Sequence, residues 1–319
     1  MDAEAEFKAG AAAKGGLLNP QAPWVETTVD TADGAKIHVR SYGPVDAQPV
    51  VLIHGFACRL EYWNPQINRF RDQYRVIAYD QRGLGRSTLG RAGVHPKVLG
   101  DDLAAVLDTT VSPERPAVLV GHSFGGITIM AWAEGHPEQV RTLAAATLLA
   151  NTVAARFRAT TGVMPFAGRY GAIRAPLLSL VMRARLSVPA GAPISRAVRA
   201  IAMSPQATLA QADFLRAMVT SVPTGIRNQW GEGLFKLDVL QGLEQLHVPC
   251  TVLVGEMDRL TPPEAGQAIE AVLRRRGVLH RYVELEKVGH CSNLQAAEAF
   301  DDEIIQLLEL RRQGSNSED

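Results

Sequence analysis

The clearest indication of fold in this chain is AVLVGHSFGG, residues 117–126. It opens with a short apolar run, which is typical of a strand buried on both faces of a sheet. The run continues into GHSFG, residues 121–125, which has the form G-x-S-x-G. Glycine on either side of Ser123 permits a sharp turn from strand to helix. We therefore predict a turn that projects the Ser123 hydroxyl above a sheet edge, with a helix from Phe124 to about Gly135.

Short apolar runs alternate with helical patterns on both sides of this turn. Upstream, VETTVD and AKIHVRSY flank a turn at Asp33-Gly34 and predict an antiparallel hairpin at a sheet edge. The other predicted strands are VVLIHG (50–55), RVIAYD (75–80), RTLAAATLL (141–149), TVLVGEMD (251–258) and HRYVEL (280–285), and further helices are predicted from about Asn64, over 96–110, after Pro262-Pro263 and over 293–312. This pattern predicts an α/β fold, a mostly parallel twisted sheet flanked by helices.

One segment interrupts the alternation of strands and helices. Residues 151–225 are rich in Arg, Ala, Leu and Pro with helical spacing, and they predict a helical cap inserted into the core. The core then consists of residues 24–150 and 226–312. We expect residues 1–23 to be a flexible lead-in and residues 313–319 a polar tail.

Composition excludes several classes of protein. The 319 residues are 46% hydrophobic and 21% charged, as in ordinary globular proteins, and 33 basic residues balance 33 acidic ones, unlike a nucleic-acid binder. Cys58, Cys250 and Cys291 are widely spaced and odd in number, which favours reduced thiols over disulfides or a zinc site. The N-terminus lacks a signal-peptide pattern, and no run approaches the roughly 20 apolar residues of a membrane span. We expect a cytoplasmic protein that binds no nucleic acid.

Four motifs in this order resemble those of the α/β-hydrolase family, over roughly residues 25–312. HGF, residues 54–56, ends a predicted strand, where the family's oxyanion loop opens. DQRGLGRS, residues 80–87, resembles the family's D-x-R-G-x-G-x-S turn, which is mainly structural. The turn at Ser123 is the third motif, and an acid and a histidine segment complete the set. The resemblance implies an α/β-hydrolase core with a helical cap, similar to serine esterases and lipases.

The same resemblance implies a catalytic triad. A serine hydroxyl needs a base, and the base needs a carboxylate that holds it in the productive tautomer. Asp258 follows the predicted strand 251–258, where the family keeps its acid, although Glu256 is a nearby rival and Asp258 also suits a helix cap. His290, between the last predicted strand and helix, matches the family's catalytic histidine.

The oxyanion hole follows from the same motifs. The resemblance implies that the backbone N–H groups of Phe56 and Phe124 stabilise the oxyanion. His54 and His122 are expected to shape their turns rather than to transfer protons. The sequence contains no H-E-x-x-H, no Walker A motif and no G-x-G-x-x-G after a strand, so we expect no metal and no cofactor.

The expected reaction is hydrolysis of a small-molecule acyl ester, lipid-like and of moderate or greater chain length, through an acyl-enzyme on Ser123. Acyl thioester hydrolysis, cofactor-free perhydrolase or haloperoxidase activity, carbon–carbon bond hydrolysis and acyl transfer to an alcohol use the same triad and stay open. A ligand-binding protein of this fold stays open as well. Serine at the turn disfavours the epoxide hydrolases and haloalkane dehalogenases of the family, which carry aspartate there.

Charge is unevenly distributed in the predicted cap. Residues 151–222 contain nine Arg, no Lys and a single acid, Asp213. A lid with an Arg face is expected to attract anionic lipid, phosphate groups or a carboxylate, whereas a solvated face paired with acids elsewhere is the alternative. Its apolar face over the acyl site would include Val163, Met164, Phe166, Leu177, Leu178, Leu180 and Met182.

Overall fold

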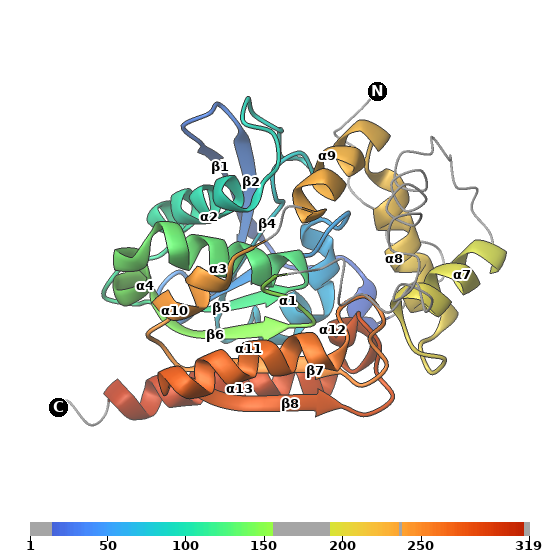
Figure 1. Ribbon diagram of the computed structural model, residues 1–319. Coiled ribbons are helices and arrows are strands. Elements are labelled where there is room, and N and C mark those ends of the chain that lie inside the picture. Colours follow the sequence, from blue (N-terminus) through green and yellow to red (C-terminus); the bar gives the residue numbers. More distant parts are fainter. Residues whose placement is uncertain (1–14, 156–191, 236–237, 316–319) are drawn as a thin grey trace.

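The computed structural model describes residues 15–155, 192–235 and 238–315 (Figure 1). Eight strands form one sheet in the order β1-β2-β4-β3-β5-β6-β7-β8. β1 and β2 form an antiparallel hairpin, β2 pairs antiparallel with β4, and all other pairs are parallel. The strands are Trp24–Asp30, Lys36–Tyr42, Pro49–Ile53, Arg75–Tyr79, Ala117–His122, Ala144–Ala150, Cys250–Gly255 and Leu279–Leu285. The predicted mostly parallel sheet with an edge hairpin is confirmed.

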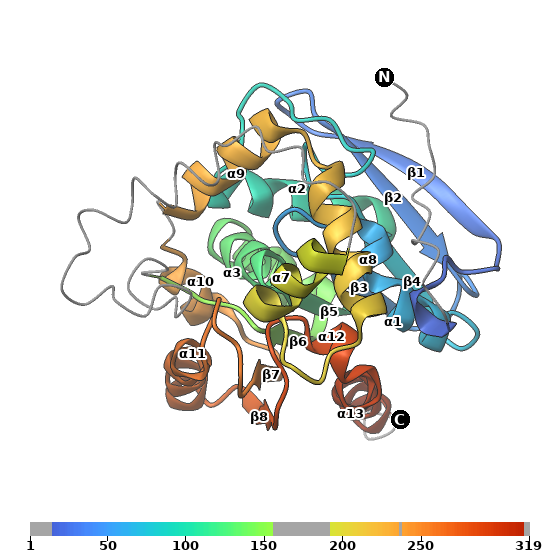
Figure 2. The same ribbon diagram turned by 90° about the vertical axis from the view of Figure 1, so that its right-hand side faces the viewer.

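Helices cover both faces of this sheet (Figures 1 and 2). Alternate strand residues point to opposite faces, so Val51 and Leu119 join one hydrophobic cluster while Leu52 and Val120 join the other. The helices are α1 Asn64–Phe70, α2 Pro96–Thr110, α3 Phe124–Gly135, α4 Pro137–Leu143, α10 Leu240–Gln245, α11 Pro263–Arg276, α12 Ser292–Gln295 and α13 Ala297–Ser315. The first cluster packs against α2, α3, α10 and α11, and the second against α1 and α13.

Two predicted elements begin or end elsewhere. The strand predicted over 141–149 starts only at Ala144, because Pro137 opens the helix α4 at a position where its missing N–H costs nothing. The helix predicted over 293–312 is divided into α12 and α13 at Ala296, whose φ of −131° and ψ of 53° are not helical. α13 extends to Ser315, into the predicted polar tail.

Part of the predicted flexible lead-in is docked on the core. A short 3-10 helix, η1 (Gly15–Leu17), ends with Leu17 buried. Asn64 Nδ2 donates hydrogen bonds to Leu17 O at 3.1 Å and to Asn19 Oδ1 at 3.0 Å. Residues 1–14 lie outside the described residues.

Three helices, α7 (Ala192–Ala202), α8 (Leu209–Ser221) and α9 (Thr224–Phe235), lie beyond the carboxyl ends of the strands (Figures 1 and 2). The chain leaves the core at Ala155 and returns at Asp238, where these two residues form a β-bridge. The return comes after the predicted boundary at 225, because α9 precedes it. The apolar residues predicted for the lid, Val163 to Met182, and six of the nine Arg of 151–222 fall within 156–191, outside the described residues.

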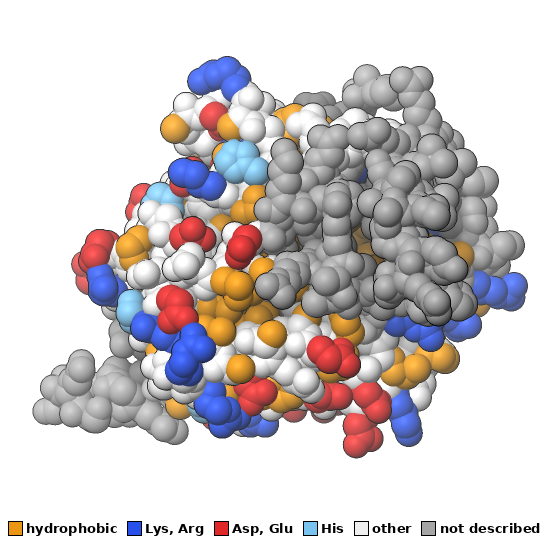
Figure 3. Space-filling model, in the orientation of Figure 1, with side chains coloured by type: hydrophobic (Ala, Val, Ile, Leu, Met, Phe, Trp, Pro, Cys, Tyr) orange, Lys and Arg blue, Asp and Glu red, His pale blue; other side chains and the backbone are white. Residues whose placement is uncertain are grey.

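The described surface carries both signs of charge. On the face that Figure 3 shows, Lys and Arg side chains are interspersed with Asp and Glu. Among the helices that the structure describes, none is long and apolar enough to cross a membrane.

Candidate active site

Ser123 occupies the turn between β5 and α3 in a strained backbone conformation. Its φ is 54° and its ψ is −115°, a region that residues with a side chain rarely adopt. The Ser123 N–H donates to Ala150 O at 2.9 Å, and the Ser123 carbonyl accepts from Thr152 Oγ1 at 2.6 Å and from Gly126 N–H at 3.0 Å. These bonds fix the turn to the end of β6 and to the start of α3.

The glycines of this turn leave no room for a side chain. A Cβ atom added at Gly121 would lie 2.6 Å from the backbone of Gly125, and one added at Gly125 would collide with the carbonyl oxygen of Ile53 in β3. The close approach of α3 to the sheet therefore requires both glycines, as the G-x-S-x-G pattern predicts.

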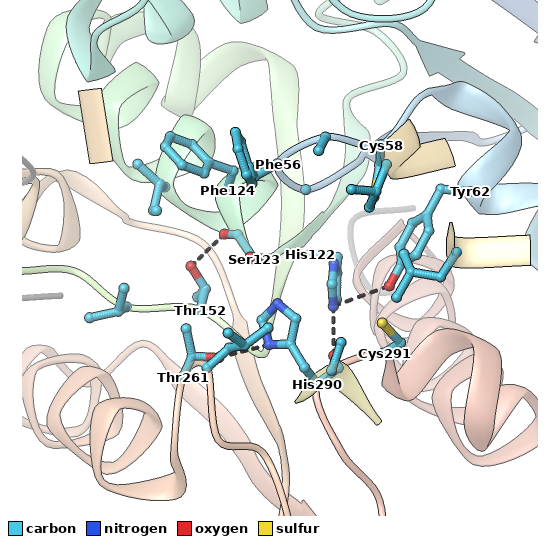
Figure 4. A pocket seen from close by; sticks show the side chains of 18 residues that line it. Phe56, Cys58, Tyr62, His122, Ser123, Phe124, Thr152, Thr261, His290 and Cys291 are labelled. Carbon is cyan, nitrogen blue, oxygen red and sulfur yellow. Dashed lines mark hydrogen bonds between the residues drawn. The ribbon is translucent and has the colours of Figure 1, made fainter. Parts of the chain in front are cut away.

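His290 and Asp258 meet at the same edge of the sheet. Asp258 follows β7, and His290 lies between β8 and α12. His290 Nδ1 lies 2.8 Å from Asp258 Oδ2, and both side chains are buried. Because a carboxylate only accepts, Nδ1 carries the proton and Nε2 is free to act as a base. Figure 4 shows the other edge of the His290 ring directed toward Ser123.

The Asp258 carboxylate is enclosed by donors. It accepts hydrogen bonds from Leu260 N–H at 2.8 Å, Thr261 N–H at 3.0 Å, Thr261 Oγ1 at 2.7 Å and Asn151 Nδ2 at 2.9 Å. Burial raises the pKa of Asp258, but the charge of His290 and these hydrogen bonds outweigh burial and hold the pKa below its usual range. Asp258 is therefore ionised at neutral pH, the state that orients an imidazole.

The rival acid does not share this setting. Glu256 is exposed and accepts a hydrogen bond from Lys287 N–H at 2.7 Å. Of the two carboxylates, only Asp258 contacts His290.

Sequence reasoning missed Asn151 and Thr261. Ser292 Oγ donates to Asn151 Oδ1 at 2.5 Å, which turns the amide NH₂ of Asn151 toward Asp258. The Thr261 hydroxyl also lies 3.1 Å from His290 Nδ1. The available signal was position, since Asn151 directly follows β6 and Asp258 follows the neighbouring strand β7, and the carboxyl ends of parallel strands share an edge.

Phe56 and Phe124 bring two backbone amides to this edge. Phe56 follows β3, and Phe124 is the first residue of α3. Within the described residues neither amide N–H has a hydrogen-bond partner. Both are thus available to an oxyanion next to Ser123, the arrangement that acyl transfer needs. Their side chains stand side by side above Ser123, with ring centroids 6.3 Å apart (Figure 4).

The two motif histidines are buried and hydrogen-bonded. His122 Nε2 lies 2.7 Å from the carbonyl oxygen of His290 and donates to it (Figure 4). Burial and the charge of His290 lower the pKa of His122 to about 3. His54 Nε2 accepts from Gln81 N–H at 3.1 Å and His54 Nδ1 donates to Gly55 O at 2.9 Å, while burial lowers the pKa of His54. Both rings are neutral links between loops, in agreement with the structural role expected of them.

A cavity of about 180 Å³ opens onto Ser123 and His290. Cys58, Tyr62 and Cys291 line one side of it (Figure 4), and burial raises the pKa of Cys291 to about 12, so this thiol stays protonated. The remaining apolar lining comes from Phe56, Ala57, Phe124, Ile127, Val153, Ala202, Leu215, Val219 and Leu260. In the part of the chain that the structure describes, no Lys, Arg, Asp or Glu lines the cavity, and no three His, Cys, Asp or Glu side chains could hold a metal ion together.

The family model described as "Alpha/beta hydrolase family" matches residues 50–303. The chain is 25% identical over 278 residues, 86% of its length and 93% of the relative's, to "3-oxoadipate enol-lactonase 2" of Acinetobacter baylyi. A shorter match, 36% identical over 110 residues, covers 34% of this chain and 39% of "Bifunctional esterase/perhydrolase DCH" of Acinetobacter calcoaceticus. The solved structure of an esterase from Exiguobacterium antarcticum superposes with a TM-score of 0.73 at 20% identity, over 89% of this chain and all of that one.

Proposed function

The chain belongs to the alpha/beta hydrolase family, and on this premise we propose that it is a serine hydrolase that cleaves carboxylic esters through an acyl-enzyme on Ser123. One observation carries the proposal: Ser123 and His290 line the same apolar cavity, and His290 is hydrogen-bonded to Asp258. The esterase and lactonase named among the similar proteins act on carbon–oxygen acyl bonds, which supports the same class of reaction.

In the proposed mechanism, Ser123 Oγ attacks the ester carbonyl carbon while His290 Nε2 takes the hydroxyl proton. Asp258 holds the His290 Nδ1–H and stabilises the imidazolium that forms. The Phe56 and Phe124 amides donate to the oxyanion, and the imidazolium then protonates the departing alcohol. Water, deprotonated by His290, attacks the acyl-enzyme and releases the acid.

The cavity favours a short acyl or aryl group without charge. A cavity of about 150 Å³ in another protein accommodates benzene, and the one at Ser123 has about 180 Å³. Its described lining offers no cation to a carboxylate. Size therefore favours acyl chains at the short end of the range, below the moderate or greater length that the sequence led us to expect.

Hydrolysis of nitrophenyl acetate, butyrate, octanoate and palmitate by the native protein and by Ser123→Ala tests the proposal. We expect the highest kcat/KM with butyrate, a loss toward palmitate, and no turnover by the variant. A fluorophosphonate should label the native protein alone. Equal turnover by both proteins would reject Ser123 as the nucleophile, whereas absence of both turnover and labelling would reject the serine esterase and leave a binding protein of this fold.

Acyl transfer to hydrogen peroxide is a second candidate, since one similar protein is named an esterase/perhydrolase. Peroxide would replace water in the attack on the acyl-enzyme and release a peracid. Peracid formation from ethyl acetate and peroxide, lost in Ser123→Ala, would support this reaction, and simple hydrolysis in the presence of peroxide would reject it.

Contact of the cap with anionic lipid stays a prediction. Among the described arginines of 151–222, Arg216 pairs with Asp213 at 2.8 Å and Arg199 donates to Ala207 O at 3.3 Å. Flotation with phosphatidylserine vesicles but not with phosphatidylcholine vesicles would support the contact, and equal flotation with both would reject its electrostatic basis.

A further inference from the structure

We propose that Trp230 of the helix α9 holds the oxyanion hole in shape, and that the cap thereby controls the rate of the chemical step. Trp230 is a positioning residue, since it acts through Phe56 and Phe124 and does not line the cavity. The inference rests on the proposed function and names a further residue on which that function depends.

Trp230 completes a cluster of three aromatic rings with the two residues whose amides form the oxyanion hole. The Trp230 ring is fully buried. It stands edge-on to Phe124, with centroids 4.9 Å apart and planes at 72°, and its centroid lies 6.3 Å from that of Phe56. Because Phe56 and Phe124 also contact each other, each ring of the cluster touches the other two.

The far end of the Trp230 side chain is tied to a rigid point of the core. Trp230 Nε1 donates a hydrogen bond to the carbonyl oxygen of Arg82 at 3.1 Å. The Arg82 guanidinium is itself buried and donates two hydrogen bonds of 2.6 Å to Asp102 and two, of 2.9 and 3.2 Å, to Asp33. Because its ring is anchored in this way, Trp230 restrains the two Phe side chains that pack against it.

The loop that carries the Phe56 amide depends on such outside support. Ala57, the next residue, has a φ of 55°, which is strained for a residue with a side chain. Within the described residues, the only backbone hydrogen bond inside this turn is long, 3.4 Å from Cys58 N–H to Gly55 O. The same Gly55 carbonyl accepts from His54 Nδ1 at 2.9 Å, which orients the Gly55–Phe56 peptide plane. Packing of the Phe56 ring against Trp230 and Phe124 restrains Phe56 on the other side of that peptide.

This restraint matters for the chemical step more than for binding. An oxyanion donor acts when charge develops on the carbonyl oxygen, and loss of one donor costs about 10²- to 10³-fold in kcat. Loss of the Trp230 ring leaves a void beside both Phe rings and displaces the donors without deleting them. We expect kcat to fall by about ten- to a hundred-fold, part of the cost of deleting a donor, while KM for a short ester stays close to the native value.

The test compares Trp230→Ala, Trp230→Phe and the control Phe214→Ala in the full chain. Phe214 is a buried cap aromatic on α8 that belongs to the hydrophobic cluster on the other face of the sheet and lies outside the cavity lining. For each protein we would measure kcat and KM for nitrophenyl butyrate, thermal unfolding, and Ki for an alkyl trifluoromethyl ketone. Ser123 Oγ adds to the carbonyl carbon of this ketone, and the proton of the Ser123 hydroxyl passes to His290. The oxyanion that forms occupies the oxyanion hole.

We expect Trp230→Ala to lower kcat and raise Ki by the same factor, Trp230→Phe to retain most of both because a ring remains, and Phe214→Ala to change only the unfolding temperature. A folded Trp230→Ala with native kcat and Ki would overturn the inference. So would losses in Phe214→Ala as large as those in Trp230→Ala. If Trp230→Ala does not fold, Trp230→Leu takes its place, with the same two outcomes. Failure of the native protein to hydrolyse esters or react with fluorophosphonate would instead reject the proposed function beneath it.

Discussion

The two sides of the candidate site are held by different forces. On the acid side, Asp258 and His290 are enclosed by hydrogen bonds from Asn151 and Thr261, which come from loops of the core. On the oxyanion side, the N–H groups of Phe56 and Phe124 have no partner among the described residues. One hydrogen bond, from His54 Nδ1 to Gly55 O, holds the Phe56 peptide, and Trp230 packs against both Phe rings from the cap. Substitutions on the acid side should change protonation and stability, whereas those on the oxyanion side should change the stabilisation of the transition state.

Removal of the nucleophile should cause the largest loss of kcat of any substitution on either side of the site. Ser123→Ala should lower kcat by about 10⁵-fold or more, since members of a triad act as a unit. The measurement is burst and steady-state release of nitrophenol, with circular dichroism to show that the variant is folded. Residual turnover of a few per cent would mean that Ser123 is not the nucleophile and that neither side of the site serves it.

Asp258→Asn tests the acid side most directly. The amide cannot hold the His290 tautomer as the carboxylate does, so kcat should fall by about 10⁴-fold. The control is Glu256→Gln, which changes the rival acid that is exposed and bonded to Lys287 N–H. Steady-state kinetics should find the control within about twofold of the native protein, as for a surface substitution away from the site. A larger loss in the control than in Asp258→Asn would exchange the roles of the two acids.

Asn151→Ala should combine a smaller loss of rate with a loss of stability. The variant removes a donor to Asp258, leaves the buried Ser292 hydroxyl without its acceptor, and places alanine at a φ of 48°. An unsatisfied buried polar group costs about 1–3 kcal/mol, so the free energy of unfolding in urea should fall by about that amount. Ser292→Ala, which removes the hydroxyl itself, is the matched control and should cost less. Equal stability of Asn151→Ala and the native protein would refute this account of the acid side.

The sequence predicts the acid side better than the oxyanion side. Ser123, Asp258 and His290 each follow a recognisable strand within a short motif, so local pattern and family resemblance suffice to propose them. Trp230 and Arg82 are 148 positions apart in the chain, and no local pattern links them. The return of the chain to the core at Asp238 was missed for the same reason, because a β-bridge to the distant residue Ala155 defines it. The core strands were predictable from apolar runs, whereas contacts between cap and core depend on packing across the whole chain.

His122 provides the weakest and most selective test, because it lies on the acid side without carrying charge. Burial and the charge of His290 lower its pKa from 6.5 to about 3. Between these pH values His122 is protonated in the unfolded chain and neutral in the folded protein. The free energy of unfolding that this group contributes above pH 6.5 is therefore lost as the pH falls toward 3. The slope from this group is at most about 1.4 kcal/mol per pH unit. His122→Gln lacks the titrating group and can still donate to the His290 carbonyl, so urea unfolding from pH 7 to 4 should find a shallower loss than in the native protein. The pH profile of kcat/KM should keep its shape, since a group that is neutral throughout contributes no limb to it. A shift in the pH dependence of kcat/KM would instead show that His122 takes part in proton transfer together with His290.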